Sequence, residues 1–323
     1  MGLFDEQIAR KPNKYPWTDD FIKAAWDNFW TPDEFDFKSD YHDYLVTLNN
    51  QEKEIIEKSL SAISQIEVSV KKFWSKLSDN FPHPSICDLG FVLANQETVH
   101  NRAYEKLLTV LSLEDRFSFH IKEEIFQKRS DYLRLHLEKV FKDDKKQYLY
   151  SLILFTFFVE NISLFSQFYI ILYFNKFKVV LKDTAQQVNY TRFEESCHFQ
   201  VGVKLINTLR QEYPELFDVE LEKNLIRKAR TAFEVEVKLI DWILKDFDEE
   251  CLNRNVLIEY IKTRFNQSYE SIGYKSIFLI DDNLVSKFKW MDEQVVGNNK
   301  TDFFHAKSTN YRTVEIPDPN DLF

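Results

Sequence analysis

Two segments of the chain place a glutamate three residues before a histidine. They read Glu97-Thr98-Val99-His100 and Glu195-Ser196-Cys197-His198. Because residues three apart lie on the same face of a helix, each segment can direct a carboxylate and an imidazole toward one point. The chain contains seven histidines, so roughly one such pair is expected by chance. The pairs become informative only together with the residues that precede them.

A single glutamate in an apolar, helical stretch precedes each pair, Glu67 before the first and Glu160 before the second. One Glu from each of two helices and Glu-x-x-His from each of two more form the ligand set of ferritin-like di-iron and di-manganese proteins. Two divalent cations neutralise four carboxylates, and oxygen donors with one imidazole per ion suit manganese or iron. Taken singly, each residue has an ordinary structural explanation. Together they predict a dinuclear metal site whose ligands are Glu67, Glu97, His100, Glu160, Glu195 and His198.

The elements that must position these residues are predicted to be helices. The chain has only 5 glycines and 8 prolines, with no glycine between Gly90 and Gly202, so turn-rich β structure is excluded. Apolar residues recur at three- and four-residue steps, which is the helical pattern. The expected fold is all-α, a ferritin-like helical bundle with additional helices. The expected helices cover residues 41–80, 88–114, 115–142, 178–212 and 218–248, with shorter ones in 252–290.

The stretch 146–175 is apolar enough to cross a membrane by its length. Glu160 lies near its centre, with Asn161 and Gln167 close by. Because an ionisable group at bilayer depth costs several kcal/mol, we predict no membrane crossing. The stretch is instead expected to form the most buried helix of the bundle.

Composition limits the remaining possibilities. The 323 residues carry a net charge of −10, which argues against a nucleic-acid partner. Three separated cysteines without a Cys-x-x-Cys pair suit a reducing cytoplasm better than a disulfide scaffold. From Gly297 the sequence turns polar, which predicts a domain over residues 1–296 and a flexible tail over 297–323.

Three further features accompany the ligand motifs. They are the segment Asn28-Phe29-Trp30-Thr31-Pro32-Asp33-Glu34, the acid Glu194 directly before Glu195, and Phe303-Phe304 followed by Tyr311 and an acidic, apolar end. In these features and in the order of its ligands, the sequence resembles the radical-generating (β, small) subunit of class I ribonucleotide reductase. The resemblance covers nearly the whole chain.

The resemblance implies an oxidoreductase subunit. Its dimetal cofactor would generate and store an oxidising equivalent, and a relay would run from His100 through Glu194 and Trp30 to Tyr311. The catalytic (α) subunit would receive the equivalent and reduce ribonucleotides to deoxyribonucleotides for DNA replication. The resemblance further implies a homodimer, and a tail that docks the catalytic subunit.

Three positions bear on the metals that this resemblance implies. Glu67 replaces the aspartate that most subgroups have as first ligand, and Glu194 replaces the usual aspartate of the relay. Tyr104, four residues after His100, occupies the position of the radical tyrosine. The sequence looks most like the dimanganese subgroup, class Id, which superoxide activates and in which Tyr104 need not carry a radical. A Mn/Mn centre is therefore favoured, with Fe/Fe or Mn/Fe as alternatives.

Lys71 lies four residues after Glu67 and is expected on the same helix face. Its positive charge could guide an anionic oxidant such as superoxide to the cofactor. The competing interpretation is a lysine that extends to solvent.

Two other functions are compatible with part of this pattern. A ferritin-like dimetal oxidase or monooxygenase acting on its own substrate would share the six ligands but would need neither Trp30 nor Tyr311. A metal-storage or purely structural helical protein would also tolerate the loss of Glu194.

Overall fold

The computed structural model describes residues 2–138 and 144–291, apart from the side chains of 67–69 and 132–138. Within these ranges the chain forms helices and no strand, with one isolated bridge between Glu249 and Leu252. The prediction of an all-α fold is confirmed.

In the first half, the helices are α1 (Trp17–Asp27), η1 (Pro32–Glu34), α2 (Lys38–His42), η2 (Asp43–Thr47), α3 (Asn50–Ser75), α4 (Leu77–Asn80), α5 (Pro84–Val110), α6 (Glu114–His120) and α7 (Glu124–Glu138). In the second half, they are α8 (Lys145–Leu154), η3 (Phe155–Ser163), α9 (Phe165–Lys178), α10 (Lys182–Glu212), η4 (Pro214–Leu216), α11 (Val219–Leu244), α12 (Arg254–Ser271) and α13 (Asp282–Phe288).

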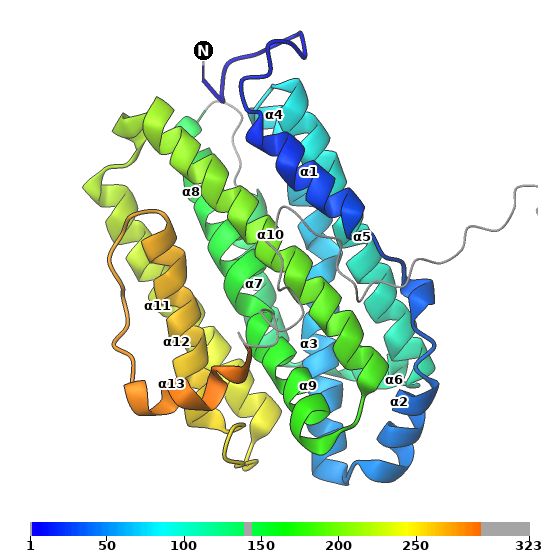
Figure 1. The fold of residues 1–323 in the computed structure, drawn as a ribbon. Helices are drawn as coiled ribbons and strands as arrows, with labels where there is room; N and C mark the ends of the chain where they lie inside the picture. Colours follow the sequence, from blue (N-terminus) through cyan, green and yellow to red (C-terminus); the bar gives the residue numbers. More distant parts are fainter. Residues whose placement is uncertain (1, 139–143, 292–323) are drawn as a thin grey trace, which may run out of the picture.

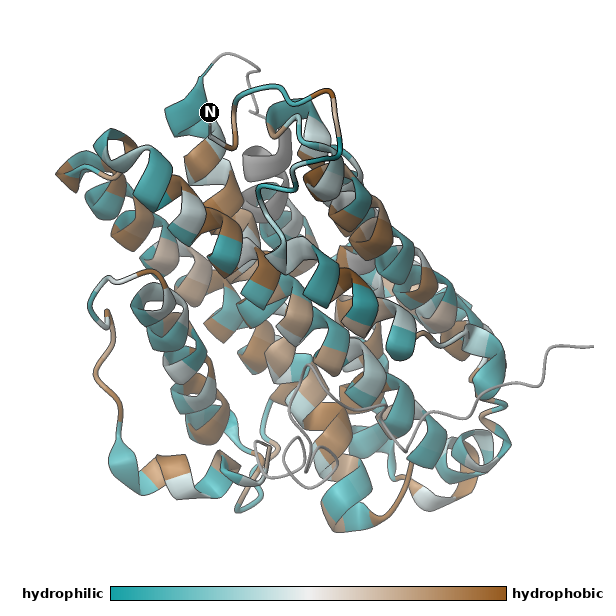
Figure 2. Cartoon of the chain, turned by 45° about the horizontal axis from the view of Figure 1, so that its top comes forward, coloured by the Kyte–Doolittle hydropathy of each residue, from teal (hydrophilic) through white to brown (hydrophobic). Residues whose placement is uncertain are grey.

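The long helices form one bundle (Figure 1). Helix α3 packs along α5, and α10 packs against η3 and α9. Helix α1 covers α5, while α11 and α12 pack together on the other side of the bundle. Figure 2 shows hydrophobic and hydrophilic residues side by side along most helices, as expected when one face of each helix enters the core.

The apolar run lies inside this bundle. Residues Lys145–Lys178 are long and apolar enough to cross a membrane, but 94% of their most apolar window is buried inside the protein. They form α8, η3 and α9, whose neighbours are other helices of the same chain. The expectation of a core segment is confirmed, although the run is three helical pieces rather than one.

Helix boundaries differ from the expected ones for identifiable reasons. The stretch predicted as one helix from residue 41 is divided: its first residues belong to α2 and η2, and α3 begins separately at Asn50. Asn49 accepts hydrogen bonds from the Gln51 and Glu52 amides at 3.0 Å and caps α3. The helix predicted from residue 88 begins at Pro84, which needs no amide donor in a first turn. The predicted helix over 115–142 is broken into α6 and α7.

The middle piece of the apolar run, η3, is a π-helix. Two arginines bind backbone carbonyls at its end. The Arg264 Nε donates to Asn161 O at 2.9 Å, and the fully buried Arg129 donates to Ser163 O. Arg129 also donates to Ala62 O of α3 at 2.9 Å and pairs with Glu236 of α11 at 3.3 Å. The wide helical turn is therefore fixed to α3, α7, α11 and α12.

Helices α10 and η3 approach closely at Gly202. A Cβ at this position would lie 2.2 Å from Thr156 Oγ1 and 2.4 Å from Thr156 Cγ2. Thr156 precedes Glu160 by four residues, and Gly202 follows His198 by four residues. The absence of a side chain at residue 202 thus sets how near the two ligand-bearing helices come.

Candidate metal centre

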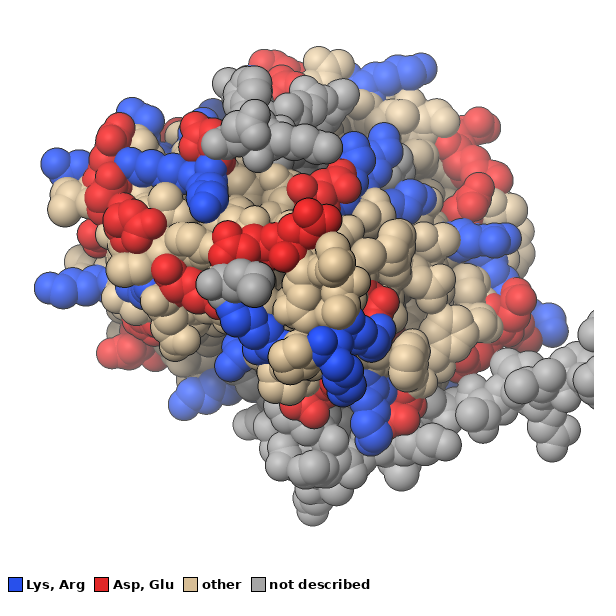
Figure 3. Space-filling view, turned by 90° about the horizontal axis from the view of Figure 1, so that it is seen from above, with Lys and Arg blue, Asp and Glu red and all other residues tan. Residues whose placement is uncertain are grey.

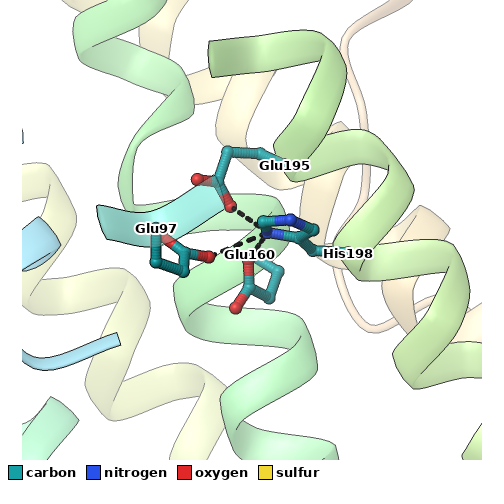
Figure 4. A group of neighbouring side chains, drawn as sticks. All are labelled: Glu97, Glu160, Glu195 and His198. Atoms are coloured by element: carbon teal, nitrogen blue, oxygen red, sulfur yellow. Dashed lines mark ion pairs between the residues drawn. The ribbon is translucent and has the colours of Figure 1, made fainter. Parts of the chain in front are cut away.

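Four predicted ligands meet in the middle of the bundle (Figure 4). Glu97 comes from α5, Glu160 from η3, and Glu195 with His198 from α10. All four side chains are buried, and one ligand atom of each lies within 4.8 Å of the others. Helical spacing explains the pairing on α10, because residues 195 and 198 share one face.

His100 completes a two-sided arrangement. Its Nδ1 lies 3.4 Å from Glu97 Oε2 and 3.1 Å from Glu195 Oε1. On the other side, His198 Nδ1 lies 2.8 Å from Glu97 Oε1 and 3.5 Å from Glu195 Oε2. Of the two imidazoles, that of His198 is the one close to Glu160, with Nδ1 3.3 Å from Glu160 Oε2. The two oxygens of Glu97, and those of Glu195, are thus divided between the two imidazoles, as bridging ligands of two cations would be.

The buried oxygens test whether this group fits cations. Within the described chain, no hydrogen bond of good geometry reaches either oxygen of Glu97 or Glu195, or Glu160 Oε2, which face only one another and the two imidazoles. Buried polar atoms are costly without a partner. Divalent cations would satisfy all of these oxygens and neutralise the carboxylates. The donor set of oxygen and imidazole fits manganese or iron.

Raised pKa values favour protons on this cluster when cations are absent. Burial and the neighbouring Glu195 raise the pKa of Glu160 well above its usual range. Burial disfavours a charged His198, but the neighbouring carboxylates of Glu97, Glu160 and Glu195 together outweigh this effect and raise the pKa of the imidazole. Because cations must displace these protons, acid pH weakens metal binding at this site.

Glu194 joins the centre to Trp30. Glu194 Oε2 accepts a hydrogen bond from Trp30 Nε1 at 2.9 Å and lies 2.7 Å from His100 Nε2. The indole ring of Trp30 is stacked near the His100 imidazole, with ring centroids 6.1 Å apart. All three residues are at most 1% exposed. The structure therefore brings together the first three members of the relay that the sequence comparison implied.

Of the remaining predicted site residues, two have described side chains. Tyr104 is buried, with its hydroxyl 3.4 Å from Thr191 Oγ1. Lys71 Nζ donates to Asn101 Oδ1 at 3.2 Å. The backbone of Glu67 lies in α3, but its side chain is outside the described part, as are Tyr311 and the tail 297–323.

Sequence reasoning missed two side chains that contact the centre. Trp74 Nε1 donates to Glu160 Oε1 at 3.0 Å. Gln96 Nε2 donates to Glu194 Oε1 at 2.7 Å, and its Oε1 lies 3.1 Å from His198 Nε2. Trp74 follows Glu67 by seven residues and so recurs on its helix face, which was an available signal. Gln96 directly precedes a ligand and has no distinctive spacing.

Residues 7–284 match the sequence family described as "Ribonucleotide reductase, small chain". The chain belongs to this family. As a small chain of ribonucleotide reductase, it is an oxidoreductase subunit, and the match spans every described ligand. The alternative of an oxidase with its own substrate is not favoured.

A curated relative supports this assignment over most of the sequence. The chain is 27% identical over 309 residues to the ribonucleoside-diphosphate reductase subunit beta of Treponema pallidum, covering 92% of this chain and 86% of the relative.

Small chains of known structure share the fold. The R2 subunit from Clostridium botulinum aligns with a TM-score of 0.80 at 20% identity, covering 91% of this chain and 93% of that one. The dimanganese(II) NrdF from Streptococcus sanguinis aligns with a TM-score of 0.72 at 14% identity, covering 88% and 99%. The bundle is therefore ferritin-like, as expected.

Proposed function

We propose that this chain generates and stores an oxidising equivalent at a dinuclear metal centre and delivers it to a catalytic subunit that reduces ribonucleoside diphosphates. The observation that carries the proposal is the division of the Glu97 and Glu195 oxygens between two imidazoles. The same centre is hydrogen-bonded through Glu194 to a buried tryptophan. A storage or structural protein would need no such connection.

The bound metals would supply reversible one-electron chemistry in a dry interior. The protein residues then manage the accompanying proton. Removal of an electron from Trp30 makes its indole N–H strongly acidic, and Glu194 Oε2 at 2.9 Å is placed to accept that proton. His100 Nε2, at 2.7 Å from the same oxygen, keeps Glu194 oriented. Tyr311 is proposed as the next member of the relay toward the catalytic subunit.

The tail residues provide a test of this function. Removal of residues 305–323 is expected to reduce reductase activity to background, because docking and Tyr311 are both lost, while metal content stays unchanged. Activity is measured after mixing with the catalytic subunit. Full-length Tyr311→Phe is the matched control, since it should bind the catalytic subunit and still be inactive. Undiminished activity of the truncated chain would support a protein that acts alone.

We further propose a Mn/Mn centre activated by superoxide, with Fe/Fe and Mn/Fe as the alternatives. Glu at position 67 supports this choice, as does the shared fold with a dimanganese NrdF. In such a centre Tyr104 need not be oxidised. The proposal also includes a homodimer in the cytoplasm, in keeping with three cysteines that are all free in the structure.

Lys71 offers a test of the oxidant. Its half-buried ammonium is held toward α5 by Asn101, rather than extended away from the bundle. We expect Lys71→Met to slow the activation of the manganese-loaded protein by superoxide about tenfold, because a positive charge raises the local concentration of an anion. The rate is followed by electron paramagnetic resonance. The neighbouring exposed Lys72→Met is the control and should activate normally. An equal rate for both variants would remove Lys71 from the mechanism.

A further inference from the structure

Gln96 occupies a position between the two halves of the centre. It lies on α5 directly before Glu97 and is 4% exposed. Its side-chain nitrogen donates to Glu194 Oε1 at 2.7 Å, and its side-chain oxygen lies 3.1 Å from His198 Nε2. The amide therefore spans the gap between the relay acid and the second histidine.

Chemistry fixes which way this amide points. Glu194 Oε2 accepts from Trp30 Nε1 and faces His100 Nε2, so the group acts as a carboxylate that only accepts hydrogen bonds. The NH₂ group of Gln96 must therefore face Glu194, which leaves its carbonyl oxygen toward His198. A carbonyl oxygen can only accept, so the proton of a neutral His198 must sit on Nε2. Its Nδ1 lone pair then faces the carboxylate cluster.

The two imidazoles consequently have different partners. His100 Nε2 donates to a carboxylate, whereas His198 Nε2 donates to a neutral amide. An imidazole that donates to an anion is the more basic ligand. Both imidazoles nevertheless connect to the same acid, because Gln96 links His198 to Glu194 and thereby to Trp30.

We propose that Gln96 is a positioning residue that fixes the tautomer of His198 and ties the second metal position to the relay acid. It makes the two positions unequal, since the position beside His198 depends on an amide that a single substitution removes. This inference rests on the proposed dinuclear centre. It states that Gln96 supports metal binding at the position beside His198 more than at the position beside His100.

The test is a Mn²⁺ titration of the metal-free protein followed by electron paramagnetic resonance, which separates a single ion from a coupled pair. Gln96→Met preserves length and volume but removes both hydrogen bonds. We expect the affinity for one ion to change less than about threefold, and that for the second to fall by about 10- to 100-fold, the usual effect of losing such a partner. A single-ion signal should then persist at ratios where the native protein shows the coupled pair.

Leu93→Met is the matched control, because it alters packing one turn earlier on α5 without removing a hydrogen bond. It should titrate as the native protein does. If Gln96→Met does not fold, Gln96→Asn serves instead, since its shorter amide cannot reach both partners. Equal binding of both ions by the variant, or equal weakening of both, would overturn the inference. Failure of the native protein to bind two ions would instead contradict the dinuclear centre itself.

Discussion

Replacing Trp30 with phenylalanine is expected to lower reductase activity by at least about 100-fold while both metal ions remain bound. Phenylalanine preserves much of the apolar contact of this 1% exposed side chain but lacks the N–H that donates to Glu194. It is also much harder to oxidise than an indole. The loss should therefore appear in electron transfer and not in assembly of the centre. Activity with the catalytic subunit and metal content measure the two effects separately.

The matched control for this substitution is Trp242→Phe. Trp242, on α11, packs against His120 of α6 and Lys58 of α3 and is not one of the ligands. Its replacement should leave activity within about twofold of the native value, since it changes packing and a cation–π contact but no group of the relay. Activity of Trp30→Phe above a tenth of native would show that the oxidising equivalent leaves by another route.

The second large effect is expected from Gly202→Ala, which should abolish binding of two ions. The new Cβ would lie 2.2 Å from Thr156 Oγ1 and 2.9 Å from Thr156 Cβ, so α10 and η3 must separate. Overpacking of this kind costs about 1–3 kcal/mol in the core. More importantly, it moves Glu160 away from His198, whose Nδ1 lies 3.3 Å from Glu160 Oε2. Metal content per chain and the Tm report the two consequences.

A second substitution distinguishes steric displacement from general damage. Thr156→Ala removes the two nearest atoms, Oγ1 and Cγ2, and should restore at least part of the second ion when combined with Gly202→Ala. Thr156→Ala alone should bind both ions. If Gly202→Ala binds both ions normally, or if the double variant is no better than the single one, the contact does not set the ligand distance.

The part of the site that could be predicted from sequence is the part that depends on spacing. Glu97 and His100 share a helix face, as do Glu195 and His198, and their order with Glu160 indicated which helices must converge. Spacing could have placed Trp74 on the helix face of Glu67, but it could not give the hydrogen bonds of Trp74 or Gln96. These depend on the rotation of α3 against η3 and of α5 against α10.

The fold, too, was predictable only in part. Amphipathic repeats predicted the helices, and the lone acid in the apolar run indicated a core segment. In residues 155–163, however, every side chain is buried, so no exposed face marks the helical turns, and the sequence did not reveal a π-helix. Helix starts were also missed where a local cap decided them, as at Asn49.

The π-helix between Phe155 and Ser163 restricts how the sequence of this protein can evolve. Each residue advances a regular helix by about 100°, so losing one residue here would rotate Glu160 relative to everything that follows it. Replacing one apolar side chain by another does not change the rotation of Glu160 about the helix axis. Homologous sequences should therefore vary among apolar residues in residues 155–163 but keep the length of this segment almost unchanged.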